Sequence, residues 1–170
     1  MGSLSLRILG IDPGLGHTGW GVIEYIQNTP RHLANGTIKT NPKMPLSDRL
    51  AKILKDLEQV ITLWDPQEAA IEETFVNSNP ASALKLGQAR GVALSAPALM
   101  GISVAEYAPN KIKKTVVGAG HAGKEQIQMM IGILMPGVQL SSADAADALA
   151  VAVCHAHHRE SISYNVLEGA

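Results

Sequence analysis

The chain has 170 residues, of which 46% are apolar and 17% are charged, and its formal net charge is −1. These values are typical of one folded domain with a hydrophobic core, and they exclude an intrinsically disordered chain. Cys154 is the single cysteine, which excludes a disulfide framework and indicates a reducing compartment. The longest apolar stretch without charge, Gly91 to Ala105, is too short to span a membrane. We therefore expect a cytoplasmic protein.

The first half of the chain predicts strands around one amphipathic helix. Apolar runs bounded by turn residues predict the strands, and apolar residues at three- and four-residue steps predict the helix. The expected strands are Leu6–Ile11, Thr18–Ile26, His32–Thr40 and Glu68–Glu72, and the expected helix is Leu46–Leu63.

The second half predicts alternating helices and one further strand. Asn79 and Pro80 indicate a helix start, since Asn caps helices and Pro fits their first position. The many small residues of this helix indicate close packing, within the domain or across a dimer. A strand over Ile102–Glu106 and helices over Gly123–Leu134 and Ser141–His157 follow. This order predicts an α/β fold with a mixed five-stranded sheet and helices on both faces. We expect a single domain over residues 6–160, with tails at 1–5 and 161–170.

Four acidic residues lie where apolar sequence is expected. Asp12 and Glu72 each end an apolar run, while Asp144 and Asp147 lie in a segment of alanine and leucine. A carboxylate at the edge of a core costs several kcal/mol unless it is paired or binds a cation. No Lys or Arg lies nearby in sequence to pair with Asp12, Asp144 or Asp147. Mg²⁺, which prefers oxygen ligands and leaves room for phosphate, is the simplest explanation.

Asp12 and Asp144 also have a simpler structural interpretation. Asp12 begins a common Asp-Pro-Gly turn signature, and Asp144 is placed to form a capping box with Ser141. Asp147 escapes that explanation, because it lies one turn further into the expected helix and on the same face as Asp144. Strand alternation allows only one of Glu72 and Glu73 to face such a site, and the residues alone do not choose between them.

Basic residues dominate the middle of the chain. Between Thr74 and Ala143 the acids are Glu106 and Glu125, whereas the basic residues are Lys85, Arg90, Lys111, Lys113, Lys114 and Lys124. This pattern fits either a solvated positive face or a nuclease, in which cations hold backbone phosphates around an acidic metal site.

Two glycine-rich segments match nucleotide-binding motifs incompletely. Gly14–Gly19 matches G-x-G-x-x-G, but strand-forming residues follow it where a dinucleotide-binding fold requires a helix. Gly118–Lys124 matches the start of a P-loop, but Glu125 replaces the Ser or Thr that binds Mg²⁺. We therefore expect neither motif to bind a nucleotide, although Lys124 at a helix start could hold a DNA phosphate.

Two further features carry a weaker functional signal. His155, His157 and His158 lie near the expected end of a helix. A favourable interaction with the helix dipole explains this position better than a zinc site does. Phe75 is the only phenylalanine and lies in a polar segment, which favours a base-stacking residue over a core residue.

These residues together resemble the RuvC family of Holliday-junction resolvases, the crossover junction endodeoxyribonucleases of bacteria. The resemblance extends in order from Leu6 to about His158. The matching segments are Gly10–Gly14, Ala70–Glu72, Ser82–Val92, Lys114–Gly118 and Ala143–Ala150.

The resemblance implies a ribonuclease H-like fold and a bacterial, cytoplasmic homodimer that works with the branch-migration complex RuvA-RuvB. The implied substrate is a four-way DNA junction, cut by paired symmetric nicks in recombination and repair. The cofactor would be Mg²⁺, two ions per active site, with Mn²⁺ as a substitute. The implied catalytic and metal-binding carboxylates are Asp12, Glu72, Asp144 and Asp147, and the DNA-binding residues are Phe75, Lys113 and Lys124.

Some roles remain open at this point. Arg90 is expected either to contact DNA or to serve the interface of its helix. One alternative function is an actin- or hexokinase-type phosphotransfer domain, since Gly10–Gly14 also resembles the phosphate loop of that group. A second alternative is a non-catalytic module that binds junctions.

Overall fold

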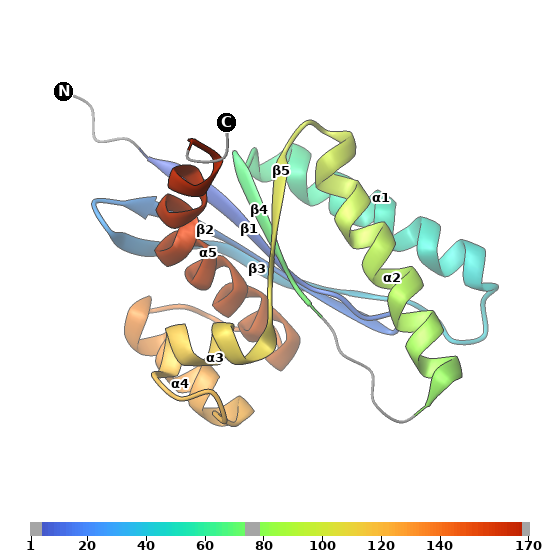
Figure 1. Ribbon diagram of the computed structural model, residues 1–170. Coiled ribbons are helices and arrows are strands. Elements are labelled where there is room, and N and C mark those ends of the chain that lie inside the picture. Colours follow the sequence, from blue (N-terminus) through green and yellow to red (C-terminus); the bar gives the residue numbers. More distant parts are fainter. Residues whose placement is uncertain (1–4, 74–78, 168–170) are drawn as a thin grey trace.

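A mixed β-sheet forms the centre of the computed structural model, which describes residues 5–73 and 79–167, with side chains described up to residue 159 (Figure 1). The strands are β1 (Leu6–Asp12), β2 (His17–Ile26), β3 (Thr29–Lys39), β4 (Glu68–Glu72) and β5 (Ser103–Tyr107). Their order in the sheet is β3-β2-β1-β4-β5. β1, β2 and β3 form an antiparallel meander, while β4 is parallel to β1 and β5 is parallel to β4. The predicted mixed five-stranded sheet is confirmed.

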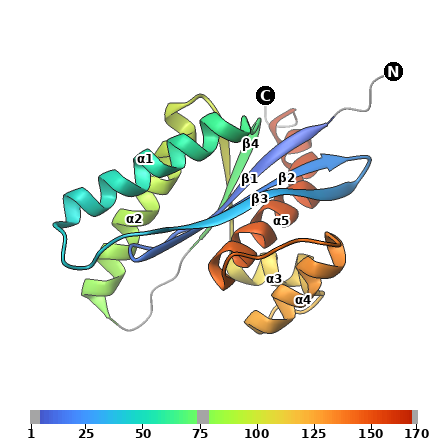
Figure 2. The same cartoon turned by 180° about the vertical axis from the view of Figure 1, so that it is seen from behind.

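Helices cover both faces of this sheet, as predicted (Figure 2). The helices are α1 (Leu46–Trp64), α2 (Pro80–Leu99), α3 (Pro109–Val117), α4 (Lys124–Leu134) and α5 (Ala143–Leu167). Successive side chains of a strand point to opposite faces. Leu9 and Ile11 of β1 accordingly pack in one core with α1 and α2, whereas Ile8 packs in a second core with α3, α4 and α5.

Glycines in β1 and β2 allow α5 to lie directly on the sheet. A Cβ atom on Gly10 would overlap the backbone carbonyl oxygen of Ala148, and one on Gly19 would overlap that of Asp144. Only a residue without a side chain permits so close an approach. These glycines therefore bring the first turns of α5 next to the end of β1.

The structure differs from the predicted elements mainly in the second half. Helix α3 was not predicted, although Pro109 at its first turn and Gly118, with φ of 88°, just after its end are typical helix boundaries. Helix α5 continues to Leu167, beyond the predicted end at His157.

The β2–β3 hairpin is longer than predicted, because β3 begins at Thr29 rather than His32. The turn consists of Gln27 and Asn28, which both have positive φ angles, of 49° and 62°. Positive φ at both central residues suits the right-handed twist of the two strands. Because Leu6 pairs with Tyr25 and Asp12 with Gly19, this turn lies at the opposite end of β1 from Asp12.

No helix in the described residues is both long enough and apolar enough to span a membrane.

Candidate metal centre

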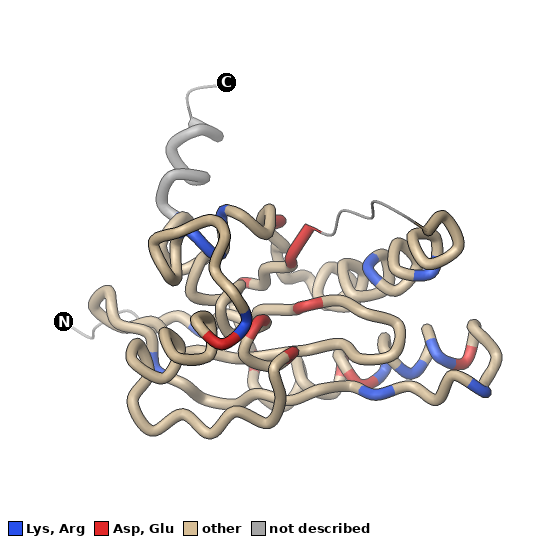
Figure 3. Tube along the Cα trace, turned by 90° about the horizontal axis from the view of Figure 1, so that it is seen from below, with Lys and Arg blue, Asp and Glu red and all other residues tan. Residues whose placement is uncertain are grey.

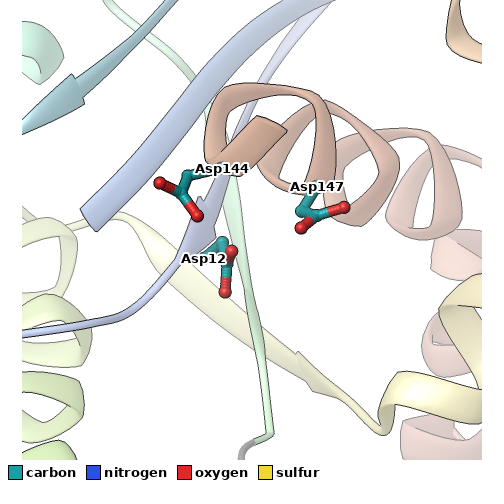
Figure 4. Close-up of side chains that lie close together, drawn as sticks. All are labelled: Asp12, Asp144 and Asp147. Carbon is teal, nitrogen blue, oxygen red and sulfur yellow. The ribbon is translucent and has the colours of Figure 1, made fainter. Parts of the chain in front are cut away.

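Three carboxylates meet where the end of β1 lies against the start of α5. Asp12 is the last residue of β1, and Asp144 and Asp147 lie in the first two turns of α5. One oxygen from each carboxylate lies within 4.8 Å of the others (Figure 4). Among the described residues, this is the only grouping of at least three His, Cys, Asp or Glu side chains that could hold a metal ion.

Glu72 lies beside this group on the neighbouring strand and lines one cavity with Asp12 and Asp147, although its carboxylate is not among those within 4.8 Å of one another. β4 runs parallel to β1, and their paired residues Ile11 and Ile71 place the ends of both strands side by side. The negative charge of Glu72 acts to raise the pKa of Asp12, so the two carboxyl groups lie near each other. Glu73 does not line this cavity. The geometry thus favours Glu72 over Glu73, the choice that the residues alone left open.

Burial and mutual repulsion make this group of carboxylates electrostatically unfavourable without a cation. Burial, followed by the charges of Glu72 and Asp147, raises the pKa of Asp12 to about 8. Burial likewise raises the pKa values of Glu72 and Asp147 above their ordinary values. A divalent cation would offset the negative charges and relieve the repulsion. Carboxylate oxygens around a small space are the donor set that suits Mg²⁺.

Two lysines lie beside the carboxylates. Lys113 of α3 and Lys124, the first residue of α4, line a cavity of about 290 Å³ together with Asp12, Glu72 and Asp147. The positive charges of both lysines act to lower the pKa values of Glu72 and Asp147, against the effect of burial. Seen from below, acidic and basic positions lie side by side near the middle of the fold (Figure 3). Such a cavity can hold a phosphate next to a metal ion.

The capping box that could have explained Asp144 is not formed by Ser141. Ser142 caps α5 instead, because its hydroxyl accepts a hydrogen bond of 3.0 Å from the backbone N–H of Ala145. The Asp144 side chain is therefore not required for the helix start, and it lies against Asp12.

The remaining candidate residues lie elsewhere. Arg90 of α2 does not line the cavity; its guanidinium donates a hydrogen bond to the backbone carbonyl of Glu72. Phe75 lies outside the described residues. Because α3 was not predicted from the sequence, the placement of Lys113 beside Lys124 could be found only from the structure.

The histidines near the end of α5 do not form a metal site among the described residues. His155 is buried between the hydroxyl of Tyr107, at 2.8 Å, and the carboxylate of Glu68, at 2.7 Å. Arg159 donates two hydrogen bonds to the same carboxylate, over 3.0 and 2.6 Å. This network connects the first residue of β4 to α5, at the other end of the strand from Glu72.

Sequence comparison gives a consistent family for this arrangement. The family model described as "Crossover junction endodeoxyribonuclease RuvC" matches residues 8–155. The protein of that name from Bradyrhizobium diazoefficiens is 59% identical over 156 residues, which cover 92% of this chain and 89% of the relative. Its namesake from Brucella anthropi is 52% identical over 159 residues, which cover 94% and 92% of the two chains.

Solved structures agree with the sequence comparison. The structure of Thermus thermophilus RuvC in complex with a Holliday junction substrate matches with a TM-score of 0.83 and 32% identity, over 92% of this chain and 96% of that one. The yeast mitochondrial Holliday junction resolvase Ydc2 shares the fold, with a TM-score of 0.68 at 10% identity, over 94% and 81% of the chains. With a matched family model, close relatives and a matching fold, this chain belongs to the RuvC family of crossover junction endodeoxyribonucleases.

Proposed function

We propose that this protein cuts four-way DNA junctions by paired symmetric nicks on opposing strands, through metal-dependent hydrolysis of phosphodiester bonds. The observation that carries the proposal is the grouping of Asp12, Asp144 and Asp147 beside Glu72, in a member of this nuclease family. The related T. thermophilus protein was solved with a Holliday junction substrate. The products would be a 5′-phosphate and a 3′-hydroxyl, which a ligase can seal in recombination and repair.

The cofactor would be Mg²⁺, two ions per active site, with Mn²⁺ as a substitute. When bound, two such ions supply an activated water and stabilise the leaving 3′-oxygen. Four carboxylates would hold these ions: Asp12, Glu72, Asp144 and Asp147. The chain's own contribution is to fix these oxygens on the central strand β1, its neighbour β4 and the start of α5.

The DNA would lie across the cavity with its backbone against Lys113 and Lys124. Both lysines lie beside the carboxylates and can neutralise phosphates on either side of the cut. Phe75, which follows the end of β4 in the sequence, would stack on a base at the centre of the junction. Together these contacts would place one phosphodiester over the metal centre.

Two symmetric nicks need two active sites, and we propose that a homodimer supplies them through α2. Ala89, Ala93 and Ala96 of this helix are buried within the domain. In contrast, a Cβ added to Gly87 or Gly91 would meet open space, and the side chain of Leu84 is 65% exposed. Small and apolar residues on an outward face suit close packing against a second copy. The assembly would act in the bacterial cytoplasm with the branch-migration complex RuvA-RuvB.

The test is cleavage of an end-labelled four-way junction by excess protein, in Mg²⁺ and in EDTA. The wild-type protein should make symmetric nicks only with Mg²⁺. Asp147→Asn should abolish cleavage and keep junction binding, because it removes a metal ligand and leaves the lysines in place. Glu72→Gln should behave in the same way.

Glu73→Gln is the matched control, since Glu73 neighbours Glu72 but lies outside the cavity, and it should cut at the wild-type rate. Equal binding in EDTA and Mg²⁺ without any nicks would instead identify a non-catalytic binding module. A rise in melting temperature with ATP, and none with junction DNA, would favour the phosphotransfer alternative. Wild-type cleavage by Asp147→Asn would contradict the assignment of the carboxylates.

A further inference from the structure

The guanidinium of Arg90 holds the end of the catalytic strand β4 instead of facing the cavity. Arg90 lies in the middle of α2, and its side chain is 21% exposed. Its Nε donates a hydrogen bond of 3.3 Å to the backbone carbonyl oxygen of Glu72. Its Nη2 lies 3.2 Å from a carboxylate oxygen of Glu106 on β5, which is within ion-pair distance although the angles do not make a hydrogen bond. One side chain thus contacts both β4 and β5.

These contacts fall where strand pairing ends. Ile71 pairs with Glu106 and Glu72 with Tyr107 in the parallel ladder between β4 and β5. The last contact of the ladder is the bond from the backbone N–H of Glu73 to the carbonyl oxygen of Tyr107. Arg90, from the adjacent helix α2, adds a further contact to Glu72, the last residue of β4. The Glu72 side chain extends from this backbone into the cavity that Asp12 also lines.

We infer that Arg90 is a positioning residue, which fixes the backbone of Glu72 so that its carboxylate can take part in metal binding. A guanidinium is suited to this role, because its fork of N–H groups can contact a carbonyl and a carboxylate together. Groups that orient metal ligands without touching the metal commonly change metal affinity by about 10–100-fold. The inference rests on the proposed metal role of Glu72, and it replaces a DNA-contacting role for Arg90.

The first test measures metal binding without DNA. Titration calorimetry with Mn²⁺ should show that Arg90→Gln binds the metal about 10-fold more weakly than the wild-type protein. Arg90→Lys should lose less affinity, because its ammonium can keep one of the two contacts but not both. Glu106→Gln should give a smaller loss in the same direction, since it leaves the bond from Nε to Glu72 intact.

The second test separates positioning from DNA contact. Junction affinity in EDTA should stay at the wild-type level in Arg90→Gln, whereas the Mg²⁺ concentration for half-maximal cleavage should rise by about 10-fold. At saturating Mg²⁺ the cleavage rate should recover most of its wild-type value. Weaker junction binding in EDTA with unchanged Mn²⁺ affinity would overturn the inference and restore the DNA-contacting role.

Arg159→Gln is the matched control, because Arg159 holds the first residue of the same strand, Glu68, as Arg90 holds the last. It should lower the melting temperature and leave Mn²⁺ affinity unchanged. If Arg90→Gln does not fold, Arg90→Lys and Glu106→Gln decide, and wild-type Mn²⁺ affinity in both would contradict the inference. If the wild-type protein itself binds no Mn²⁺, the proposed metal centre fails as well.

Discussion

At Asp12, the same side chain that is proposed to bind metal also lowers the stability of the metal-free fold as the pH rises. Burial, followed by the charges of the neighbouring carboxylates, raises the pKa of its carboxyl group to about 8 from an ordinary 3.8. An acid with a raised pKa stabilises the fold while it is protonated. As the pH rises from about 4 to about 8, the unfolded chain therefore releases this proton before the folded chain does, and stability falls. A bound divalent cation would offset this loss.

Asp12→Asn should stabilise the metal-free protein while it abolishes cleavage, because the amide removes a charge from the cluster. At pH 8 in EDTA, we expect the melting temperature to rise by at least about 2–4 °C, the shift that about 1 kcal/mol gives in a chain of this size. The rise should shrink toward pH 4. Thermal melts of wild-type, Asp12→Asn and Glu73→Gln proteins across this range give the comparison. A melting temperature for Asp12→Asn at or below the wild-type value would contradict the repulsion argument.

Strand β4 is held at its two ends by different helices. Its first residue, Glu68, accepts hydrogen bonds from His155 and Arg159 of α5, and the carbonyl of its last residue accepts one from Arg90 of α2. The bonds from Arg159 and His155 lower the pKa of Glu68, and burial lowers that of His155. As the pH falls below 6.5, the unfolded chain protonates the histidine first. As it falls below 4.5, the unfolded chain protonates the glutamate first, so stability decreases at both steps.

Glu68→Gln should therefore destabilise the protein most at neutral pH. We expect a loss of about 1–3 kcal/mol at pH 7, because the variant weakens charge-assisted hydrogen bonds in a partly buried network. The difference from wild type should narrow at pH 4, where the wild-type carboxylate begins to lose its contribution. Urea unfolding at the two pH values measures both quantities. A difference that grows toward pH 4 would show that the network is not ionised as described.

Helix α5 reaches the candidate metal centre because glycines in β1 and β2, Gly10 among them, let it lie directly on the sheet. Gly10→Ala places a Cβ against backbone atoms of Ala148 and Ala152, which cannot move as a side chain could. We expect a loss of about 1–3 kcal/mol or more and reduced cleavage, since α5 carries Asp144 and Asp147. Gly132→Ala in α4 is the matched control, because a Cβ there meets open space. It should raise stability by about 0.5–1 kcal/mol, and circular-dichroism melts of both variants test the contrast.

At the scale of the whole molecule, the proposed dimer interface on the outer face of α2 would determine whether the protein can cut two strands. Leu84 on this helix and Leu63 on α1 are similarly exposed, at 65% and 74%. If α2 forms the dimer, Leu84→Lys should give a monomer that binds junctions weakly and does not make paired nicks. Leu63→Lys should remain a dimer, because α1 is not part of the proposed interface.

Sedimentation velocity distinguishes these outcomes, since the chain mass is 18.0 kDa and a dimer has twice that mass. A wild-type protein that sediments as a monomer at micromolar concentration would contradict the proposed interface. Dissociation by Leu63→Lys rather than by Leu84→Lys would move the interface to α1.

The parts of the fold and site that could be predicted from the sequence are those with local signals. The strand ends at Asp12 and Glu72 follow apolar runs, and Asp147 is conspicuous because nothing in its helix explains a charge. The start of α2 follows directly from Asn79 and Pro80, and the Asn79 side chain indeed accepts hydrogen bonds from the backbone of Ala81 and Ser82.

The parts that could not be predicted depend on contacts distant in sequence or on one-residue shifts. Glu68 and His155 are 87 residues apart, so no local pattern connects them. Helix α3 has only 9 residues, with Ile112 and Val116 as its buried pair, which is too short for a clear periodicity. The cap of α5 moved by one residue, to Ser142, and a shift of that size is within the usual uncertainty of helix ends.

The buried position of the only cysteine makes the protein convenient for site-specific labelling. Cys154 of α5 is buried in the core, and burial raises the pKa of its thiol, so it should react slowly with maleimides. Thr29 is exposed at the tip of the β2–β3 hairpin, which lies at the opposite end of β1 from Asp12. A fluorophore attached to Thr29→Cys would therefore sit far from the chemistry, and it could report on junction arms by energy transfer without a cysteine-free background.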